Sequence, residues 1–492
     1  MDMNPFLQHD LALALMRTCL QEQPVIIPPS PADPRHGLCL VSSLWRDVIV
    51  FNSEFWQSYS FWPVHFSNPH QQLAIFRSFI LRSGGRPLEF KFLLSIPGLE
   101  AIFSRLPINL RIFGAGKISI VNTIIAPYSN RIKSLHCTLI GLENAHFFLD
   151  LPVGSFSQLE YVNVTFIDPR RPNSPPRFTL NQRLRFTPFQ STPNLREVIC
   201  GMFSDVNILD LKLPLRELTL LNMETTPLPL NAFVPIARLC QQSLIEGHFY
   251  LKFDVGSKHF GSNLIGHPII LGCIEVLSFR LVNANWYPEF ITTLRLEKLK
   301  SLQIMRCERT APFNWDIPLY TSFISGSSGS LLSLRLQVFP YKGQEVVHLH
   351  TSACHQRPSQ EELFGFFASM PKVKSLSLPT DIHLHGGILE KVATGELLPQ
   401  LTDVEFASNR GLALIFDAFR DRSDFHYWHS PSTSASSPLS RISSVTLSIP
   451  STSADAEDSL EAKAESLRLV KGFRLRYIRT CDSCARHCRL FV

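Results

Sequence analysis

One six-residue pattern recurs along most of the chain and limits its fold more than any other feature. An apolar residue is followed by two variable residues, a second apolar residue, one variable residue and a third apolar residue. The second and third apolar positions alternate, as a short strand with one buried face requires. Ten copies are Ile132/Leu135/Cys137, Leu159/Val162/Val164, Leu195/Val198/Cys200, Leu215/Leu218/Leu220, Ile274/Leu277/Phe279, Leu299/Leu302/Ile304, Leu331/Leu334/Leu336, Val373/Leu376/Leu378, Leu401/Val404/Phe406 and Ile442/Val445/Leu447.

Between the copies lie segments that are long enough to carry the chain back to the start of the next strand. The copies begin 20 to 59 residues apart, and the longest gap has room for a degenerate copy near Leu244. Residues 362–370 and 414–422 are helix candidates within such gaps. Alternation of short strands and helices predicts a parallel sheet with helices on one side.

This pattern is the signature of a leucine-rich repeat, whose usual period is about 20–29 residues. The spacing here is irregular, and an α/β protein with many short buried strands is the alternative. The number of copies favours an irregular leucine-rich-repeat-like solenoid.

The first 62 residues have a different pattern, which predicts a small helical module. Residues 10–20 are expected to form a helix that begins at Asp10 and aligns Leu11, Leu15 and Cys19 on one side. A segment with five prolines between residues 24 and 34 excludes a helix there. A second helical segment follows, and its wide apolar face contains Leu40, Val41, Leu44, Trp45, Val48, Ile49 and Phe51.

Composition narrows the class of protein further. Of the 492 residues, 45% are apolar and 18% are charged, which indicates a folded chain. A net charge of +6 is too small for its length to indicate nucleic-acid binding. No apolar run is long enough to span a bilayer, and no signal peptide precedes the first helix. We therefore expect an intracellular protein, cytoplasmic or nuclear, with most of its eleven cysteines reduced in the core.

Residues 10–56 resemble an F-box, whose helices bind a Skp-type adaptor in cullin–RING ubiquitin ligases. Asp10-Leu11 through Cys19-Leu20 is similar to the first helix of that family. The run from Leu40 to Ile49 resembles the second half, which has a Val-Cys-x-x-Trp-Arg core, and Phe55-Trp56 stands where Leu-Trp is common. Segments 81–92, 124–139, 323–336, 362–378 and 397–406 resemble the connectors of fungal F-box proteins with leucine-rich-repeat-like regions.

The resemblance implies three regions. Residues 1–62 would be the F-box-like module, residues 63–450 the repeat-like array, and residues 451–492 a C-terminal helix followed by a basic tail that contains cysteines. A tail that binds a ligand is the alternative to a solvated one.

The resemblance also implies a function without chemistry. The module would bind a Skp-type adaptor, and through it a cullin, while the array binds an unknown target protein. Candidate anchors are Leu11, Leu15, Leu40, Trp45 and Trp56, and whether Trp45 touches the partner or only packs the module stays open. Ser42 replaces the usual Cys, so an interaction scaffold with a degenerate F-box and no ligase role is the alternative.

Two clusters have spacings that metal ligands could use. Cys481, Cys484, His487 and Cys488 lie within eight residues, which is cramped for four zinc ligands, and exposed thiols are the simpler interpretation. His348, His350, Cys354 and His355, with His383 and His385 further on, have no carboxylate at a fixed spacing. We expect no metal, no cofactor and no enzymatic activity, because no catalytic motif is present.

Overall fold

The computed structural model describes residues 5–61, 69–92, 121–140, 147–167, 188–201, 213–253, 268–282, 287–308, 315–327, 329–340, 358–379, 382, 384, 386–407, 417–422, 440, 442–450 and 474–480. The chain divides into two compact units, Met1–Thr226 and Pro227–Val492. This division falls within the predicted array of residues 63–450, and the predicted end of the N-terminal module at residue 62 stays a prediction. The predicted class, α/β with parallel strands, is confirmed in both units.

The first unit begins with helices and continues as a sheet whose strands follow one another in chain order. All its strands pair in parallel, from β1 next to β2 through to β6 next to β7. Its helices are α1 (Pro5–Leu20), α2 (Pro34–Cys39), α3 (Ser43–Phe51), η1 (Ser53–Trp56), α4 (Pro69–Arg82), η3 (Val121–Ile125), α6 (Ala126–Tyr128) and η4 (Ser129–Arg131). Its strands are β1 (Val25–Ile27), β2 (Ser58–Phe61), β3 (Leu88–Phe92), β4 (Ile132–Ile140), β5 (Tyr161–Ile167), β6 (Glu197–Gly201) and β7 (Leu220–Pro229).

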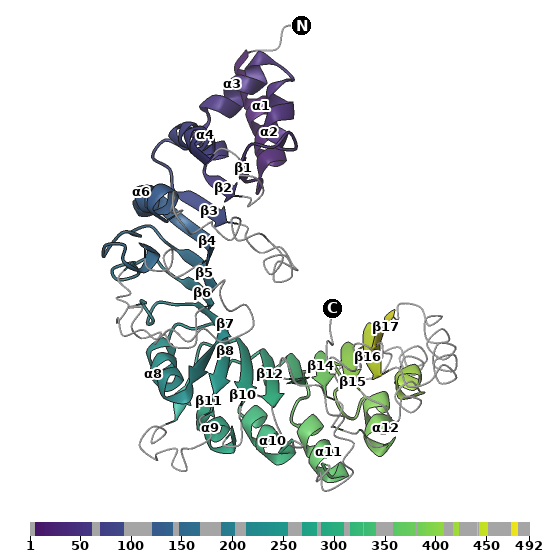
Figure 1. Ribbon diagram of the computed structural model, residues 1–492. Helices are drawn as coiled ribbons and strands as arrows, with labels where there is room; N and C mark the ends of the chain where they lie inside the picture. Colours follow the sequence, from purple (N-terminus) through teal and green to yellow (C-terminus); the bar gives the residue numbers. More distant parts are fainter. Residues whose placement is uncertain are drawn as a thin grey trace. The chain divides into compact units, whose positions relative to one another are not determined.

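The second unit has the same plan, with helices α8 to α12 along one side of its sheet (Figure 1). Its helices are α8 (Leu230–Cys240), α9 (Tyr287–Thr293), α10 (Ile317–Ser325), α11 (Gln360–Ala368) and α12 (Gly386–Thr394). Its main strands are β8 (Glu246–Lys252), β10 (Val276–Val282), β12 (Ser301–Glu308), β13 (Ser333–Pro340), β14 (Ser375–Leu378), β15 (Asp403–Ala407), β16 (Ser444–Pro450) and β17 (Arg474–Thr480). Strands β9 (Ile269–Ile270) and β11 (Leu294–Arg295) form a separate parallel pair.

Nine of the ten predicted copies fall on strands in the predicted register, which confirms the strand pattern. Their second and third positions lie on β4, β5, β6, β10, β12, β13, β14, β15 and β16. Neighbouring copies pair position for position, as with Leu302 opposite Leu334 and Ile304 opposite Leu336. The apolar residues of these copies, as far as Val445 on β16, form the buried side of each sheet.

The predicted copy Leu215/Leu218/Leu220 is wrong, because the copy in the sheet begins three residues later. Leu221 pairs with Val198, so the copy that continues the sheet is Leu218/Leu221/Met223. These three side chains are almost fully buried, whereas Leu220 is half-buried. The run from Leu213 to Met223 has enough leucines to fit either register, and only the pairing with β6 selects one.

The degenerate copy expected near Leu244 is present and lies on β8. Gly247 pairs with Leu277, and Phe249 pairs with Phe279, so the copy is Leu244/Gly247/Phe249. A β-carbon at Gly247 would lie 2.7 Å from the ring of Phe249. The glycine stands where other copies have a large residue because this ring fills the space.

Several strands match none of the ten predicted copies, among them β1, β2 and β17. The proline-rich segment contains β1, and Trp56, Tyr59 and Phe61 supply a buried copy of the pattern on β2. In the expected C-terminal tail, Arg474–Thr480 form β17, which pairs with β16. The tail is thus corrected to include a strand, and the helix expected after residue 451 lies outside the described residues.

One backbone contact repeats from strand to strand. The residue after the first apolar position offers its carbonyl oxygen to two N–H groups at the start of the next strand. Glu160 accepts from Arg196 and Glu197, and Arg196 accepts from Thr219 and Leu220. Ile245, Glu275, Lys300, Leu332, Lys374 and Thr402 do the same in the second unit. The start of each of these strands is therefore fixed by hydrogen bonds to the preceding copy. Because these bonds do not involve the loops, loops of different lengths can connect the copies.

Candidate partner-binding site

Helix α1 has two apolar lines, and only one of them faces the interior. Ala12, Met16 and Leu20 are buried, while Leu11 and Leu15 are 65% and 42% exposed. Each buried residue directly follows a position of the exposed line in the sequence. The same helix can therefore pack against the unit and also expose leucines to solvent. The helix begins at Pro5, so the prediction that it starts at Asp10 is wrong.

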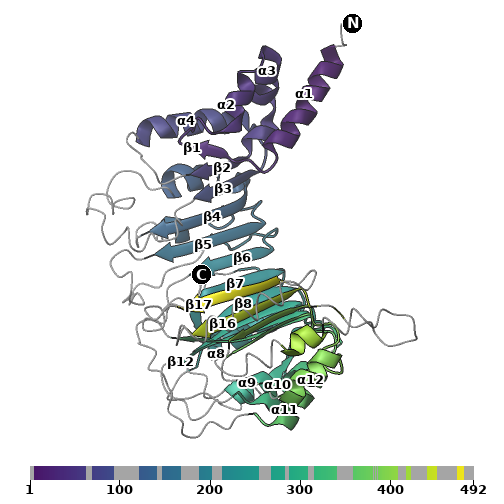
Figure 2. The same cartoon turned by 90° about the vertical axis from the view of Figure 1, so that its right-hand side faces the viewer.

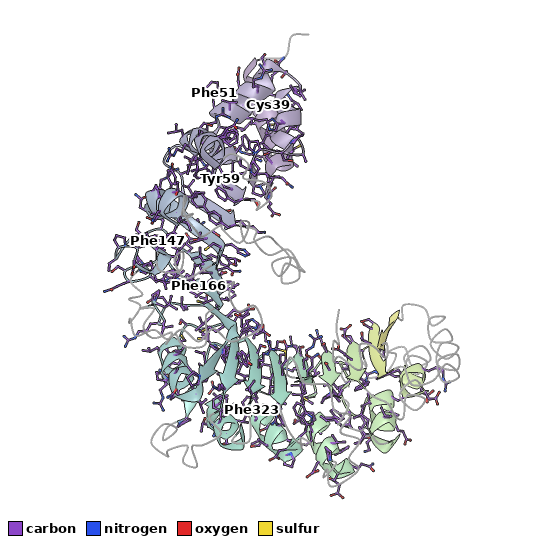
Figure 3. The ribbon with its side chains drawn as sticks, in the orientation of Figure 1. Cys39, Phe51, Tyr59, Phe147, Phe166 and Phe323 are labelled. Atoms are coloured by element: carbon purple, nitrogen blue, oxygen red, sulfur yellow. The ribbon has the colours of Figure 1, made fainter. Side chains whose placement is uncertain are left out.

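The next two helices add further exposed apolar side chains. Leu40 and Val41, between α2 and α3, are 82% and 59% exposed, and Phe51 at the end of α3 is 81% exposed. Figure 3 labels Phe51 at the end of α3 and Tyr59 in the interior beside α4. We call Leu11, Leu15, Leu40, Val41 and Phe51 the helical apolar set. Exposure of several large apolar residues on packed neighbouring helices is typical of a surface that a partner covers.

Caps fix the ends of these helices. Asp33 accepts a hydrogen bond from the backbone N–H of Arg35 at the start of α2. Ser42 accepts one from the N–H of Trp45 at the start of α3. The Ser42 that departs from the F-box pattern therefore has a local role, because serine is a strong N-cap and the cap places Leu40 and Val41 just before the helix.

The two tryptophans among the predicted anchors differ in burial. Trp56 is only 4% exposed, and its Nε1 donates a hydrogen bond to the carbonyl oxygen of Ile49 at 2.8 Å. The guanidinium of Arg82 covers its ring at 4.7 Å. Trp56 is therefore part of the interior, and it cannot be an anchor in this conformation. Trp45 is half-buried, so the structure leaves both of its predicted roles open.

A buried arginine joins the helices to the edge of the sheet. Arg35 pairs with Asp33 at 3.1 Å. It also donates hydrogen bonds to the backbone carbonyl groups of Gln23, Pro24 and Phe55. These contacts connect the start of α2, the approach to β1 and the end of η1. A buried charge whose three nitrogens all donate to partners within the protein stabilises one arrangement of the chain.

Arg422, in the helical segment 417–422, is buried in a different way. Its guanidinium donates to the carbonyl oxygens of Val392, Leu398, Pro399, Leu401 and Ser440. Burial lowers the pKa of Arg422 to about 10, so it stays charged at neutral pH. It holds together the chain around β15 and is not a ligand site.

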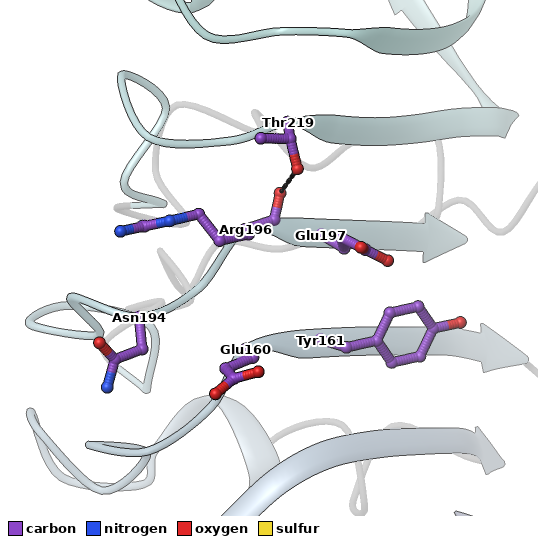
Figure 4. Close-up of a pocket in the computed structure, with 6 residues that line it drawn as sticks. All are labelled: Glu160, Tyr161, Asn194, Arg196, Glu197 and Thr219. Atoms are coloured by element: carbon purple, nitrogen blue, oxygen red, sulfur yellow. Dashed lines mark hydrogen bonds between the residues drawn. The ribbon is translucent and has the colours of Figure 1, made fainter.

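A polar hollow of about 510 Å³ lies where the chain enters β5 and β6. Figure 4 shows its lining residues, which are Glu160, Tyr161, Asn194, Arg196, Glu197 and Thr219. The hydroxyl of Thr219 donates to the carbonyl oxygen of Arg196 at 3.2 Å. Its lining combines two carboxylates, one guanidinium, an amide, a hydroxyl and an aromatic ring.

The remaining sequence predictions concern thiols, metals and membranes. Cys137, Cys200 and Cys240 are free and buried, as expected of core residues, and burial raises the pKa of the Cys200 and Cys240 thiols to about 12. Both clusters with metal-like spacing lie outside the described residues. Within the described residues, no group of His, Cys, Asp or Glu is arranged to hold a metal ion. None of the helices in that part of the chain combines the length and apolar character needed to cross a membrane.

Comparison of the chain with models of known protein families finds no match, and neither does comparison with curated protein sequences.

Proposed function

We propose that the protein is a substrate adaptor of a Skp–cullin–F-box ubiquitin ligase, in which the N-terminal helices bind the Skp-type adaptor. The observation that carries this proposal is the helical apolar set. Helix α1 already buries Ala12, Met16 and Leu20, so the core does not require the exposed Leu11 and Leu15. Apolar side chains at helical spacing suit a groove on a partner protein.

We infer that the rest of the chain is an irregular leucine-rich-repeat-like array that holds the target. In each unit the strand order follows the chain order, and every pairing is parallel. The shared carbonyl contacts give each copy the same link to its predecessor. Stacked repeats of this type provide an extended surface for protein binding and need no catalytic residue.

The second candidate is an interaction scaffold without a ligase role. Its support is Trp56, which the resemblance offers as an anchor and which lies in the interior instead. A helical face could then bind another protein with the same apolar residues. The two candidates differ in one property, which is binding to a Skp-type adaptor.

Co-purification of the full chain with a Skp-type adaptor separates them. The test variant is Leu11→Asp/Leu40→Asp, which places charges in the helical apolar set without touching the buried line of α1. The matched control is Leu81→Asp, because Leu81 on α4 is 79% exposed but is not a member of the set. We expect the wild type and Leu81→Asp to retain the adaptor and the double variant to lose it.

Failure of the folded wild type to bind the adaptor would remove the ligase proposal and leave the scaffold. Equal loss in Leu81→Asp would mean that a general decrease in surface apolarity, and not the helical apolar set, explains the result. Circular dichroism of each variant would show whether the helices remain folded.

A further inference from the structure

The hollow in the first unit contains an aromatic ring and a carboxylate that are neighbours across two strands. Tyr161 on β5 is in register with Glu197 on β6. Both residues alternate with buried ones, so their side chains lie on the face of the sheet opposite the core. Figure 4 shows the ring of Tyr161 extending along β5, with Glu197 on the adjacent strand.

The ring of Tyr161 is held at its hydroxyl end. The side-chain amide of Asn163, two residues further along β5, donates a hydrogen bond to the Tyr161 hydroxyl at 3.4 Å. Because the two residues share one face of the strand, this contact favours a ring that lies along β5. The half-buried Tyr161 is thereby held as part of the lining of the hollow.

The charges around the ring are unevenly matched. Glu160 pairs with Lys133 at 3.3 Å, and Arg196 pairs with Glu217 at 3.7 Å. Arg196 also donates to the carbonyl oxygens of Pro193 and Leu195, which directs its guanidinium away from the ring. Within the described residues no cation pairs with Glu197, so the hollow has an excess of negative charge beside an aromatic face.

In the second unit, a tyrosine at a comparable position on the sheet has an arginine as its neighbour on the next strand. Tyr250 on β8 is in register with Arg280 on β10, and the Arg280 guanidinium lies 4.9 Å from the centre of the Tyr250 ring. In the first unit the neighbours of Tyr161 in register are Ser134 and Glu197. In the part of the chain that the structure describes, no cation lies over Tyr161, and the register of Tyr250 with Arg280 shows the chemistry of a cation that fits such a ring.

We propose that the hollow binds an arginine side chain of a target protein, stacked on Tyr161 and paired with Glu197. A guanidinium stacks on an aromatic ring through its plane and donates to a carboxylate from its edge, whereas a lysine ammonium has no planar face to stack and no pair of parallel donors. A volume of about 510 Å³ admits the side chain together with part of the flanking backbone. This inference rests on the proposed role of the array in target binding and names the chemistry of the target segment.

The test uses the full chain and a fluorescein-labelled peptide, Gly-Arg-Gly-Arg-Gly-amide, with binding followed by fluorescence anisotropy. The same peptide with citrulline in place of arginine is the matched probe, because citrulline keeps the shape and loses the charge. Glu197→Gln and Tyr161→Leu alter the hollow. Glu224→Gln is the matched protein control, since Glu224 lies on the same sheet face on β7 outside the hollow.

We expect Glu197→Gln to weaken binding about tenfold, the usual effect of losing a hydrogen bond to a charged group. Tyr161→Leu should weaken it about three- to fivefold, as expected for a cation–π contact at a surface. Glu224→Gln should change it less than twofold, and the citrulline peptide should not bind. Thermal unfolding of all three variants should match the wild type.

Absence of binding to the arginine peptide by the folded wild type would overturn the proposal. So would equal losses in Glu197→Gln and Glu224→Gln, which would indicate attraction to the general charge of the sheet. Because the peptide is measured without any adaptor, the two proposals fail separately. Adaptor binding without peptide binding would remove only the arginine site, and the reverse would remove only the ligase role.

Discussion

Two surfaces of the first unit, one of helices and one of strands, expose very different side chains. Helices α1 to α3 expose leucine, valine and phenylalanine, whereas the face of β4 to β6 opposite the core has polar and half-buried side chains such as His136, Tyr161 and Asn163, with the exposed Glu197. Figure 2 shows these helices and the strands that follow them from a second side. Under the two proposals above, this difference corresponds to two kinds of partner: one that covers apolar surface, and one selected by charge and hydrogen bonds.

The largest effect should come from the interior that supports the helical surface. Trp56→Ala removes a buried ring, a hydrogen bond to Ile49 and the contact with Arg82, so we expect a loss of about 3–5 kcal/mol in the free energy of unfolding. Leu40→Ala, at a far more exposed position, should stay within about 0.5 kcal/mol. Urea unfolding would measure both, and similar losses would show that Leu40 is part of the interior.

The helical surface itself should matter for binding and little for stability. We expect Leu11→Asp/Leu40→Asp to weaken adaptor binding about 100-fold, which corresponds to about 2.7 kcal/mol. The arginine peptide should bind this variant as it binds the wild type. Calorimetric titration would measure adaptor binding, and fluorescence anisotropy would measure peptide binding. Loss of both in this variant would contradict the assignment of separate partners to the two surfaces.

The buried side of the strands should tolerate little change in volume. At Gly247 an added β-carbon would meet the ring of Phe249 at 2.7 Å, so Gly247→Ala should cost about 1–3 kcal/mol through overpacking. Gly247→Ala/Phe249→Leu should recover part of that loss, because the smaller side chain frees the space. Urea unfolding of the single and double variants tests this, and a double variant that is simply the sum of two losses would show that the ring is not the obstacle.

The smallest effect should come from His136 on the open face of β4. Burial, and secondly Lys91 on β3, lower the pKa of His136 below its ordinary value near 6.5. The unfolded chain therefore binds more protons once the pH falls below that value, and the unfolding free energy decreases there. His136→Gln should remove this part of the decrease between pH 7.5 and pH 5.5. An unchanged pH dependence of urea unfolding would show that His136 is solvated.

The sequence predicted the strands well because each strand is a local pattern, and it predicted registers less well because a register depends on a neighbour. Leu213 to Met223 fit two registers equally, and only β6 distinguishes them. On β8, Gly247 stands where other copies have a large apolar residue, because the ring of Phe249, two positions further on, fills the space.

The candidate sites were predicted in part for a similar reason. Both lines of α1 are apolar, so sequence alone shows that Leu11 and Leu15 are candidates but not that Met16 is the residue that packs inward. The hollow had no signal in the sequence, because Tyr161 and Glu197 lie far apart along the chain and become neighbours only through the pairing of β5 with β6. Trp56 belongs to a short strand copy that was hidden behind the F-box resemblance.

The attachment of the helices through Arg35 and β1 has a consequence for any shortened form of this protein. A chain that started at residue 63 would lack β1 and β2, and β3 would become the bare edge of the sheet. With these residues present, the edge strand of the sheet is the three-residue β1, which lies between Pro24 and Pro28. Arg35 already donates hydrogen bonds to the carbonyl groups of Gln23 and Pro24, just before β1. Short, proline-flanked edges resist strand addition, and longer uncovered ones invite it. Removal of the N-terminal residues should therefore produce a protein that aggregates through the uncovered edge of β3.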